Sequence, residues 1–172
     1  MRKRIGFLFQ NPDDQLFMPR VKEELLLELQ SNGFPTEDEE AVVNDVLKRV
    51  GLLEKRQYTV SRLSLGEKKR LAIASLLVKT PELWLLDEPT SNLDPGMRRE
   101  VIVMVRNLKG TRIIATHDLD LALEVCDRVL LLYKGKKIIE GDPNEILWDE
   151  EMLKRYGLAL PLTIQGVKKW GK

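Results

Sequence analysis

A strongly apolar segment that ends in two adjacent carboxylates is the feature that most constrains the fold of this chain. Residues 83–94 read LWLLDEPTSNLD, so four apolar residues lead directly into Asp87 and Glu88 and then into a proline. A continuous apolar run of this length predicts a strand buried on both faces, which is typical of a parallel sheet. Carboxylates at the end of a buried strand are costly unless positive charge meets them. The segment therefore predicts a sheet whose edge receives a cation, or a ligand that carries one.

Strand-like and helix-like segments alternate along the rest of the chain. Apolar runs predict strands, apolar residues at helical spacing predict helices, and Lys134-Gly135 predicts the turn of a hairpin. Strands are expected over 5–9, 83–87 and 112–116, helices over 21–30, 34–51, 64–80, 95–108, 118–126, 143–148 and 149–156, and the hairpin over 129–141. This alternation predicts an α/β domain with a mainly parallel sheet flanked by helices.

Residues that commonly cap helices mark three of the predicted helix starts. Thr36 and Glu39 have the spacing of a capping box, and so do Ser64 and Glu67. Asp94 is followed directly by a proline, which is typical of an N-cap residue with proline at the first helical position. These three positions are expected to begin the helices that they precede.

Composition excludes several classes of protein. The 172 residues carry 28 Lys and Arg against 27 Asp and Glu, so the net charge of +1 gives no electrostatic argument for a nucleic-acid partner. A single cysteine, Cys126, excludes an internal disulfide framework and indicates a reducing compartment. The longest apolar run, LAIASLLV (71–78), is far shorter than the roughly 20 residues that span a bilayer. Because the first residues also lack the pattern of a signal peptide, any membrane role is expected to come through a partner.

Polar side chains follow three successive predicted strands. Gln10 ends the first strand, Asp87 and Glu88 end the second, and Thr116 and His117 end the third. Taken singly, each has an ordinary structural explanation, such as a capping turn or a hydrogen-bonding histidine. In parallel sheets, however, ligands bind outside the carboxyl ends of the strands. The joint occurrence of these residues at three strand ends therefore predicts a ligand site.

Four motifs in the chain carry a family resemblance. They read FQNPDDQLF (9–17), LSLGE (63–67), LWLLDEPTSNLD (83–94) and ATHD (115–118). In this order they resemble the Q-loop, the LSGGQ signature, the Walker B strand with its catalytic glutamate and D-loop, and the H-loop of the nucleotide-binding subunits of ATP-binding cassette (ABC) transporters. Leu65 departs from the signature, which usually has glycine at that position. The resemblance covers residues 1–141 and implies a P-loop NTPase-like fold of the ABC ATPase type.

The resemblance implies a role for eight residues and two cofactors, ATP and Mg²⁺. Asp87 and Gln10 are implied to hold Mg²⁺, partly through water, and Glu88 to polarise the attacking water as a general base. His117 is implied to contact the γ-phosphate as a second catalytic residue. The signature residues Ser64, Gly66 and Glu67 are implied to serve the nucleotide that the opposite subunit holds. Asp94 is implied to lie at the dimer seam.

One part of the family pattern is not found. The phosphate cradle G-x-x-x-x-G-K-[ST] should precede the Q-loop, but only nine residues come before Gln10. The string GVKKWGK (166–172) matches it in part and is interpreted as coincidence, because it lacks the Ser or Thr and ends the chain. We therefore expect a fold that is incomplete at the N-terminus, without its Walker A loop. An internal start, a misassigned start and the second half of a split or degenerate gene all stay open as explanations.

The resemblance also implies partners. A Q-loop reading QNPDDQLF and a tail reading GLALPL (157–162) look like those of energy-coupling-factor importers for cobalt, nickel or vitamins. Such a subunit is expected to pair with a second ABC ATPase subunit and with a transmembrane subunit, in the cytoplasm on the inner face of the cell membrane. A separate chain carrying the P-loop is a further expected partner, and autonomous ATPase activity is not expected without it. A non-catalytic half-subunit and a non-transport ABC ATPase remain alternatives.

The family layout predicts the division of the chain. The ATP-binding domain is expected over 1–158, and it is expected to contain a helical subdomain over about 18–80. Phe17 and Met18, at the start of this subdomain, are candidates to contact the transmembrane partner. Residues 159–172 form a C-terminal tail, either frayed or used for docking. The transported substrate is not encoded in any motif of the chain.

Overall fold

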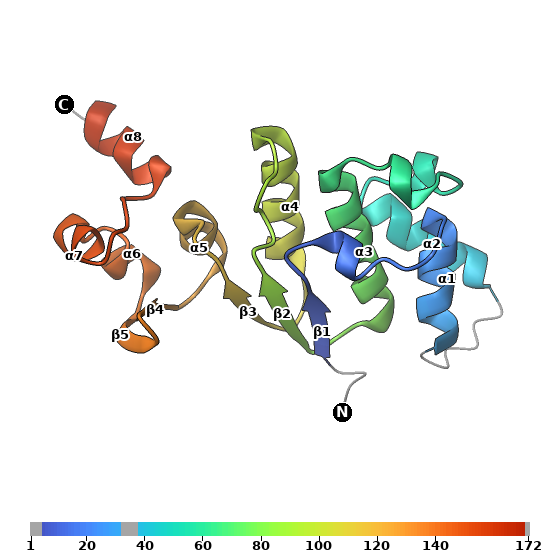
Figure 1. Ribbon diagram of the computed structural model, residues 1–172, viewed down its shortest axis with the longest axis horizontal. Coiled ribbons are helices and arrows are strands. Elements are labelled where there is room, and N and C mark those ends of the chain that lie inside the picture. Colours follow the sequence, from blue (N-terminus) through green and yellow to red (C-terminus); the bar gives the residue numbers. More distant parts are fainter. Residues whose placement is uncertain (1–4, 32–37, 171–172) are drawn as a thin grey trace. The chain divides into compact units, whose positions relative to one another are not determined.

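A computed structural model describes residues 5–31 and 38–170 of the chain. The chain divides into two compact units, Met1–Ala115 and Thr116–Lys172 (Figure 1). Within the described residues, none of the helices combines the length and the apolar character that a crossing of the bilayer requires.

The first unit is built on a parallel sheet of three strands in the order β1-β2-β3. The strands are β1 (Ile5–Leu8), β2 (Leu83–Asp87) and β3 (Thr111–Ala115). In the ladder, Leu8 pairs with Leu86 and Asp87 pairs with Ala115. The parallel α/β sheet expected from the sequence is therefore confirmed, and its strands end together at one edge.

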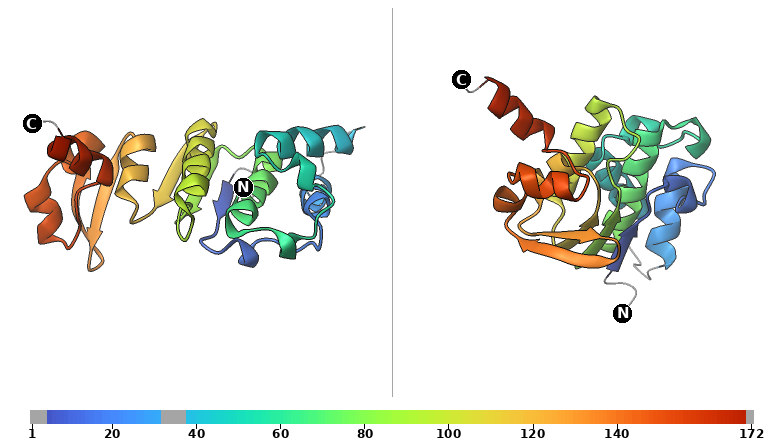
Figure 2. Two further views of the ribbon diagram at one scale, coloured as in Figure 1. Left: turned by 90° about the horizontal axis from the view of Figure 1, so that it is seen from above. Right: turned by 60° about the vertical axis from the view of Figure 1, so that its left-hand side comes forward.

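The helices of the first unit run in colour from blue to yellow-green in Figure 2. They are the α-helices α1 (Val21–Ser31), α2 (Glu39–Arg49), α3 (Leu65–Lys79) and α4 (Pro95–Asn107), and the short 3-10 helices η2 (Pro12–Asp14), η3 (Leu53–Lys55) and η4 (Val60–Arg62). Of these, α3 is the helix that packs against β1. Leu25, Leu47 and Leu71 are fully buried where α1, α2 and α3 pack together. The helices α1, α2 and α3 thus share one hydrophobic core.

Two of the three predicted helix starts are confirmed. Ser64 and Glu67 form a reciprocal capping box at the start of α3, and Asp94 accepts hydrogen bonds from two backbone amides of α4. The start of α2 differs, because Asp38 caps it by accepting from the amide of Ala41 at 2.9 Å. Thr36, the predicted cap, lies outside the described residues. Asp38 has the short carboxylate side chain that this position favours, so the helix begins later in the chain than expected.

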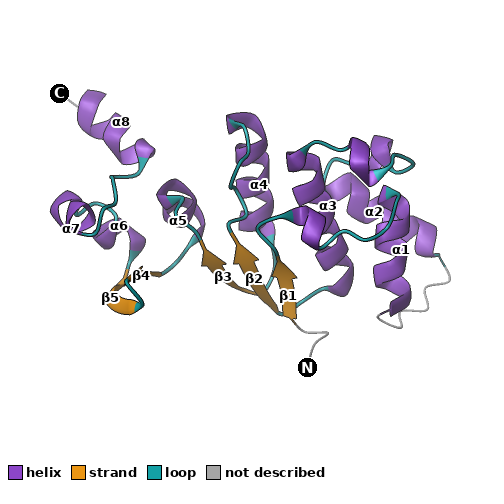
Figure 3. Ribbon diagram, in the orientation of Figure 1, coloured by secondary structure: helices purple, strands orange, loops and turns teal. Residues whose placement is uncertain are grey.

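The second unit combines a hairpin with four helices. Its elements are α5 (Leu119–Val125), β4 (Val129–Tyr133), β5 (Lys136–Gly141), α6 (Pro143–Ile146), α7 (Glu150–Arg155) and α8 (Leu162–Trp170). The predicted turn at Lys134-Gly135 is confirmed, since both residues have positive φ angles, +49° and +72°. Figure 3 separates the strands and helices of both units by colour.

The C-terminal segment is ordered as a helix rather than frayed. Ile164 of α8 is 1% exposed and packs in a cluster with Leu153 and Leu160. Asp120 on α5 accepts hydrogen bonds from the amides of Leu162 and Thr163, both at 2.9 Å, and so caps the start of α8. The frayed alternative for the tail is therefore wrong for residues 162–170, because a carboxylate 42 positions earlier in the chain satisfies the free amides of the helix.

One face of the three-stranded sheet is apolar and open to solvent. Ile5 and Phe7 on β1 are each 42% exposed, and Ile113 on β3 is 58% exposed. The opposite face is closed, because Leu8, Trp84 and Leu86 are at most 2% exposed. In the described residues β3 pairs with β2 alone, so this strand also presents an unpaired edge. An apolar face beside an open edge is a template for association.

We expect the isolated chain to self-associate through this face, and Ile113→Lys to reduce the association strongly. Lysine on an edge strand opposes pairing with another strand, and the site is open enough to accept the longer side chain. Val103→Lys is the matched control, because Val103 is 41% exposed but lies on α4. Light scattering against protein concentration is the measurement. Equal association of the two variants would contradict the assignment of the sheet face.

Candidate functional site

Two of the three predicted strand ends, that of Gln10 and that of Asp87 and Glu88, lie where the parallel sheet of the first unit stops. Asp87 is the last residue of β2 and is partly buried, and it lies in register with Ala115 of β3. Gln10 follows β1 by two residues and is exposed. Because Leu8 pairs with Leu86, the loop that carries Gln10 leaves the sheet beside the segment of Asp87 and Glu88. The register therefore brings the amide and the two carboxylates to one edge.

Glu88 has a backbone conformation that needs support. Its φ angle is +44°, in the left-handed region that non-glycine residues enter only at a cost of about 1–3 kcal/mol. Its amide donates to the carbonyl oxygen of Ala115 at 2.9 Å. Its own carbonyl oxygen accepts from Lys69 Nζ at 2.7 Å, from Ser91 Oγ at 3.0 Å and from the Ser91 amide at 3.2 Å. These four hydrogen bonds hold the backbone from which the carboxylate projects.

Lys69 is a functional candidate that the sequence analysis missed. It lies on α3 and is 1% exposed, and its ammonium group also donates to Ser91 Oγ at 3.1 Å. Burial lowers the pKa of Lys69 to about 8, although the nearby carboxylates of Glu88 and Asp87 oppose this shift. One signal could have identified it, because the apolar run 71–78 predicts a helix buried on all sides. A lysine just before such a run is expected to be drawn into the interior.

The lowered pKa of Lys69 gives a pH dependence with a defined sign. Between pH 8 and the ordinary lysine pKa of 10.5, the unfolded chain binds more protons at this residue than the folded chain does. The free energy of unfolding should therefore rise across this window, by on the order of 1–3 kcal/mol relative to a Lys69→Met variant that cannot titrate there. Urea unfolding of both proteins below pH 8 and near pH 10.5 measures the difference. If the unfolding free energies of the two proteins changed equally with pH, the shifted pKa would be contradicted.

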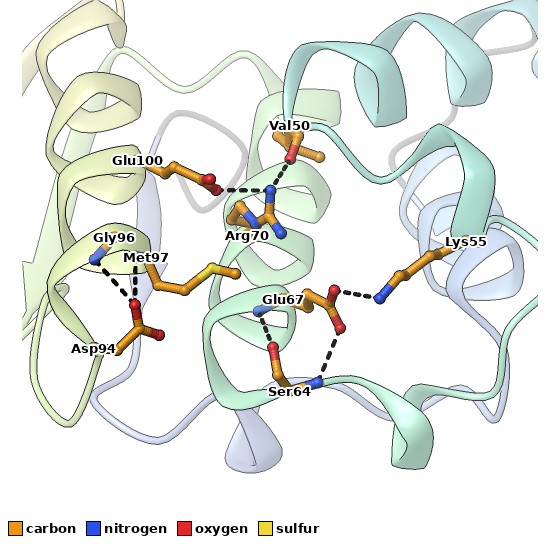
Figure 4. A network of polar contacts seen from close by, with 9 residues as sticks. All are labelled: Val50, Lys55, Ser64, Glu67, Arg70, Asp94, Gly96, Met97 and Glu100. Atoms are coloured by element: carbon orange, nitrogen blue, oxygen red, sulfur yellow. Dashed lines mark hydrogen bonds and ion pairs between the residues drawn. The ribbon is translucent and has the colours of Figure 1, made fainter.

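At the first turn of α3, Ser64 and Glu67 cap the backbone amides, and the Ser64 hydroxyl can still donate a hydrogen bond (Figure 4). Ser64 Oγ accepts from the Glu67 amide at 3.3 Å, and a carboxylate oxygen of Glu67 accepts from the Ser64 amide at 3.0 Å. Because the Ser64 hydroxyl acts as the acceptor here, its own hydrogen remains available for an anion. A helix start with a hydroxyl donor is a suitable place for a phosphate oxygen.

Neighbouring side chains hold this turn in place. Burial alone would raise the pKa of Glu67, but hydrogen bonds from Lys55 and from the Ser64 amide outweigh it, so the pKa lies below its ordinary value. Gly66 is buried against α4, where an added Cβ would come within 2.9 Å of Met97 Cγ. Glycine at this position is therefore required by helix packing, whether or not a phosphate also approaches.

Two other predicted site residues have visible structural roles. Asp94 is exposed, and its Oδ1 accepts from the amides of Gly96 and Met97 at 3.0 and 3.1 Å. His117 is exposed and belongs to the second unit, where it stands between Thr116 and the α5 cap Asp118. Thr116 Oγ1 accepts from the Asp118 amide at 3.0 Å, which fixes the turn that presents the histidine. The structure thus gathers seven of the eight predicted residues in the first unit and places His117 in the other.

The donor set at the strand ends suits a metal that brings its own ligands. No group of three or more His, Cys, Asp or Glu side chains within the described part of the chain could hold a metal ion. Asp87 and Gln10 supply hard oxygen donors at the sheet edge, which is the type that Mg²⁺ prefers. Because Mg²⁺ keeps most of its water and binds phosphate oxygens, one carboxylate and one amide are sufficient if the ion arrives with a nucleotide. The residues therefore fit a magnesium–nucleotide complex better than a resident metal.

Two hollows of the first unit lie apart from these residues. One of about 540 Å³ is lined by Arg70 and Glu100, which form an ion pair of 2.9 Å (Figure 4). Another of about 460 Å³ is lined by residues that include Phe17, Met18 and Lys68. Neither hollow is lined by any of the eight predicted site residues.

Comparisons with known proteins agree with the four motifs. The family model described as ABC transporter matches residues 1–91, which is more than half of the chain. A protein of Gloeobacter violaceus whose name describes an ABC transporter ATP-binding protein is 44% identical over 168 residues. The energy-coupling factor transporter ATP-binding protein EcfA of Methanocaldococcus jannaschii is 42% identical over 164 residues. These alignments cover 95% and 94% of this chain, and 68% and 59% of the two relatives.

Solved structures show the same fold. CbiO1 from Clostridium perfringens, described as part of the ABC transporter complex CbiONQ, superposes with a TM-score of 0.76 at 33% identity. The match covers 98% of this chain and 68% of CbiO1. A transporter described as of metal-chelate type, in an inward-facing conformation, superposes with a TM-score of 0.74 at 25% identity, over 90% of this chain and 63% of its own.

Proposed function

The chain belongs to the ABC transporter family of ATP-binding subunits, and from this premise we propose that it supplies the catalytic and signature half of an ATP-hydrolysing subunit. The observation that carries the proposal is the position of Glu88. Four hydrogen bonds hold its backbone in a strained conformation directly after Asp87, at the carboxyl edge of a parallel sheet. A carboxylate in such a supported conformation is characteristic of a site that positions a reactant.

The proposed chemistry assigns one task to each group. Glu88 would accept the proton of the water whose oxygen attacks the γ-phosphorus, while the bond to the oxygen bridging the β- and γ-phosphates breaks and ADP leaves. Asp87 and Gln10 would hold the magnesium ion that accompanies ATP, partly through water. By the family resemblance His117 would donate to the γ-phosphate, and a bound magnesium ion would supply positive charge that offsets the charge of the phosphate. The Ser64 hydroxyl and the start of α3 serve the nucleotide of an opposite ATPase subunit, with Glu67 holding that turn and Asp94 at the dimer seam.

The grip on the α- and β-phosphates has to come from elsewhere. None of the 172 residues forms a G-x-x-x-x-G-K-[ST] loop, whose backbone amides and lysine would wrap these phosphates. We propose that a P-loop segment, on the same or another polypeptide, completes the site. Without it, the carboxylates and the histidine act only on the γ-phosphate and give little affinity for ATP.

The names of the relatives guide the proposal for transport. Two similar proteins are named as energy-coupling factor transporter ATP-binding proteins, and CbiO1 is described as part of the CbiONQ transporter complex. We propose that this chain likewise couples hydrolysis to import of a metal ion or a vitamin. It would act at the inner face of the cell membrane, bound to a transmembrane subunit and to a second ATPase subunit.

The hollow beside Phe17 is the proposed contact for the transmembrane subunit. Phe17 is 73% exposed at its rim, and the backbone amides of Phe17 and Met18 both donate to Glu24 Oε2, at 2.9 and 2.8 Å. Glu24 is 1% exposed, and its burial raises the pKa of this carboxyl. The carboxylate therefore fixes the loop that presents the phenyl ring to a partner.

Replacing Glu24 by alanine should release this loop. The two amides would lose their acceptor inside the protein, which should cost about 1–3 kcal/mol of unfolding free energy. Glu24→Gln keeps an oxygen acceptor of the same shape and should retain most of the stability. In an assembled transporter, Glu24→Ala should reduce transport more than hydrolysis. If transport and hydrolysis fell in equal proportion, the coupling role of this loop would be wrong.

Covalent supply of a P-loop tests the proposed function. The segment that precedes the aligned region in the Methanocaldococcus relative is fused before residue 1, and phosphate release is measured with and without Mg²⁺. We expect Mg²⁺-dependent hydrolysis by the fusion, and no binding of Mg²⁺–ATP to the 172-residue chain at micromolar concentrations by calorimetry. A folded fusion that binds ATP but does not hydrolyse it would favour the alternative of a non-catalytic half-subunit. Tight binding by the chain alone would show that the separate P-loop is not needed.

A further inference from the structure

Lys69 is buried in a place where a lysine requires a specific reason. Its side chain belongs to α3, inside a helix that is buried from Lys69 to Leu76. Desolvating an ammonium group is expensive, and an apolar residue of similar length would avoid the cost. The packing of the helix therefore does not explain why the residue is a lysine.

The contacts of the ammonium group supply the reason. Nζ reaches the carbonyl oxygen of Glu88 at 2.7 Å and the hydroxyl oxygen of Ser91 at 3.1 Å. Ser91 Oγ in turn lies 3.0 Å from the same carbonyl oxygen. The three groups form a closed triangle around the peptide that follows the strained Glu88 residue. A charge-assisted bond at this point opposes relaxation of the left-handed backbone.

We propose that Lys69 is a positioning residue for Glu88, which fastens the signature helix α3 to the peptide that carries the catalytic carboxylate. The contact between Lys69 and the Glu88 peptide rests on geometry alone. Its consequence for hydrolysis rests on the proposed function. Ser64 caps the helix that carries Lys69 five residues later, so one helix connects the turn that would serve one nucleotide with the carboxylate that would serve another. A shift of the start of α3 would then move the backbone of Glu88.

The variant Lys69→Met separates positioning from stability. Methionine keeps the unbranched apolar stem but removes the ammonium group, so the desolvation cost disappears together with the hydrogen bonds. We expect the thermal midpoint to stay unchanged or to rise. In the P-loop fusion, kcat should fall about 10- to 100-fold while KM for ATP changes little, because a misplaced base slows the chemical step without affecting binding.

A second readout does not depend on hydrolysis. The Glu88 amide donates to the carbonyl oxygen of Ala115, and the Ser91 amide donates to the carbonyl oxygen of Glu88. Their hydrogen exchange should be faster in Lys69→Met than in the unchanged protein, with protection elsewhere in α3 preserved. Exchange is measured on the 172-residue chain and on the fusion. Lys68→Met is the matched control, since the neighbouring Lys68 pairs with Asp13 at 2.7 Å and should leave the 88–91 segment unaffected.

The two readouts distinguish the failure of this inference from the failure of the proposed function. Unchanged exchange at Glu88 and Ser91 in Lys69→Met would overturn the positioning role, whatever the activity. A general loss of protection with a lowered thermal midpoint would show an ordinary structural role and would overturn it as well. If the unchanged fusion does not hydrolyse ATP, the proposed function fails, and the exchange result alone decides whether Lys69 holds the Glu88 peptide.

Discussion

Replacing Glu88 by glutamine is expected to reduce hydrolysis by the P-loop fusion about 10²- to 10⁴-fold, with little change in the affinity for Mg²⁺–ATP. Glutamine has nearly the shape of glutamate but cannot accept the proton of the attacking water. The backbone contacts of Glu88 do not involve its carboxylate, so the φ angle of +44° and the hydrogen bond to Ala115 should persist. Single-turnover phosphate release and nucleotide binding by calorimetry measure the two effects separately.

A neutralised glutamate elsewhere controls for the change in charge. Glu54→Gln, on the exposed side of η3, should hydrolyse ATP like the unchanged fusion. Full turnover by Glu88→Gln would remove the assignment of this residue as the base. A loss of nucleotide binding together with turnover would instead indicate that the substitution disturbs the end of β2.

Truncating Leu71 to alanine is expected to lower the free energy of unfolding by about 2–5 kcal/mol. Leu71 is fully buried at the centre of the cluster formed by α1, α2 and α3, so the deleted methyl groups leave a cavity that rigid helices cannot close. For a chain of this length each kcal/mol corresponds to about 2–4 °C in the thermal midpoint. Leu27→Ala on the outer side of α1, where the side chain is 36% exposed, should cost far less.

Thermal and urea unfolding of the two leucine variants make the comparison. If both variants lost the same stability, the cluster would not be the core that supports this unit. Because the loss arises from packing, it should appear in the 172-residue chain as well as in the fusion. The prediction therefore does not depend on the proposed function.

Local sequence signals predicted most of the fold correctly. The apolar run before Asp87, the capping box of Ser64 and Glu67, and the hairpin turn at Lys134-Gly135 each depend on residues close together in the chain. Their physical causes, such as an apolar run, a satisfied amide or a positive φ angle, act over a few residues. Such features can be read from one sequence.

The features that were missed depend on contacts between distant segments. Lys69 meets Glu88 across 19 positions, and Asp120 caps α8 across 42. No spacing rule connects such pairs, because the sheet register and the packing of helices bring them together. The roles of the eight predicted site residues were in turn taken from a family resemblance, so the sequence pattern by itself predicted only a ligand site at the strand ends.

The burial of α3 has a consequence for how the protein is degraded. This helix contacts α1, α2, α4 and β1, and it therefore belongs to the helical layer and to the sheet at the same time. A protease needs an extended stretch of chain, and α3 can become extended only when both layers separate. Cleavage within α3 should then follow the global unfolding equilibrium rather than local fluctuation. Any ligand or partner that stabilises the folded unit should lengthen the lifetime of the protein in the cell in the same proportion.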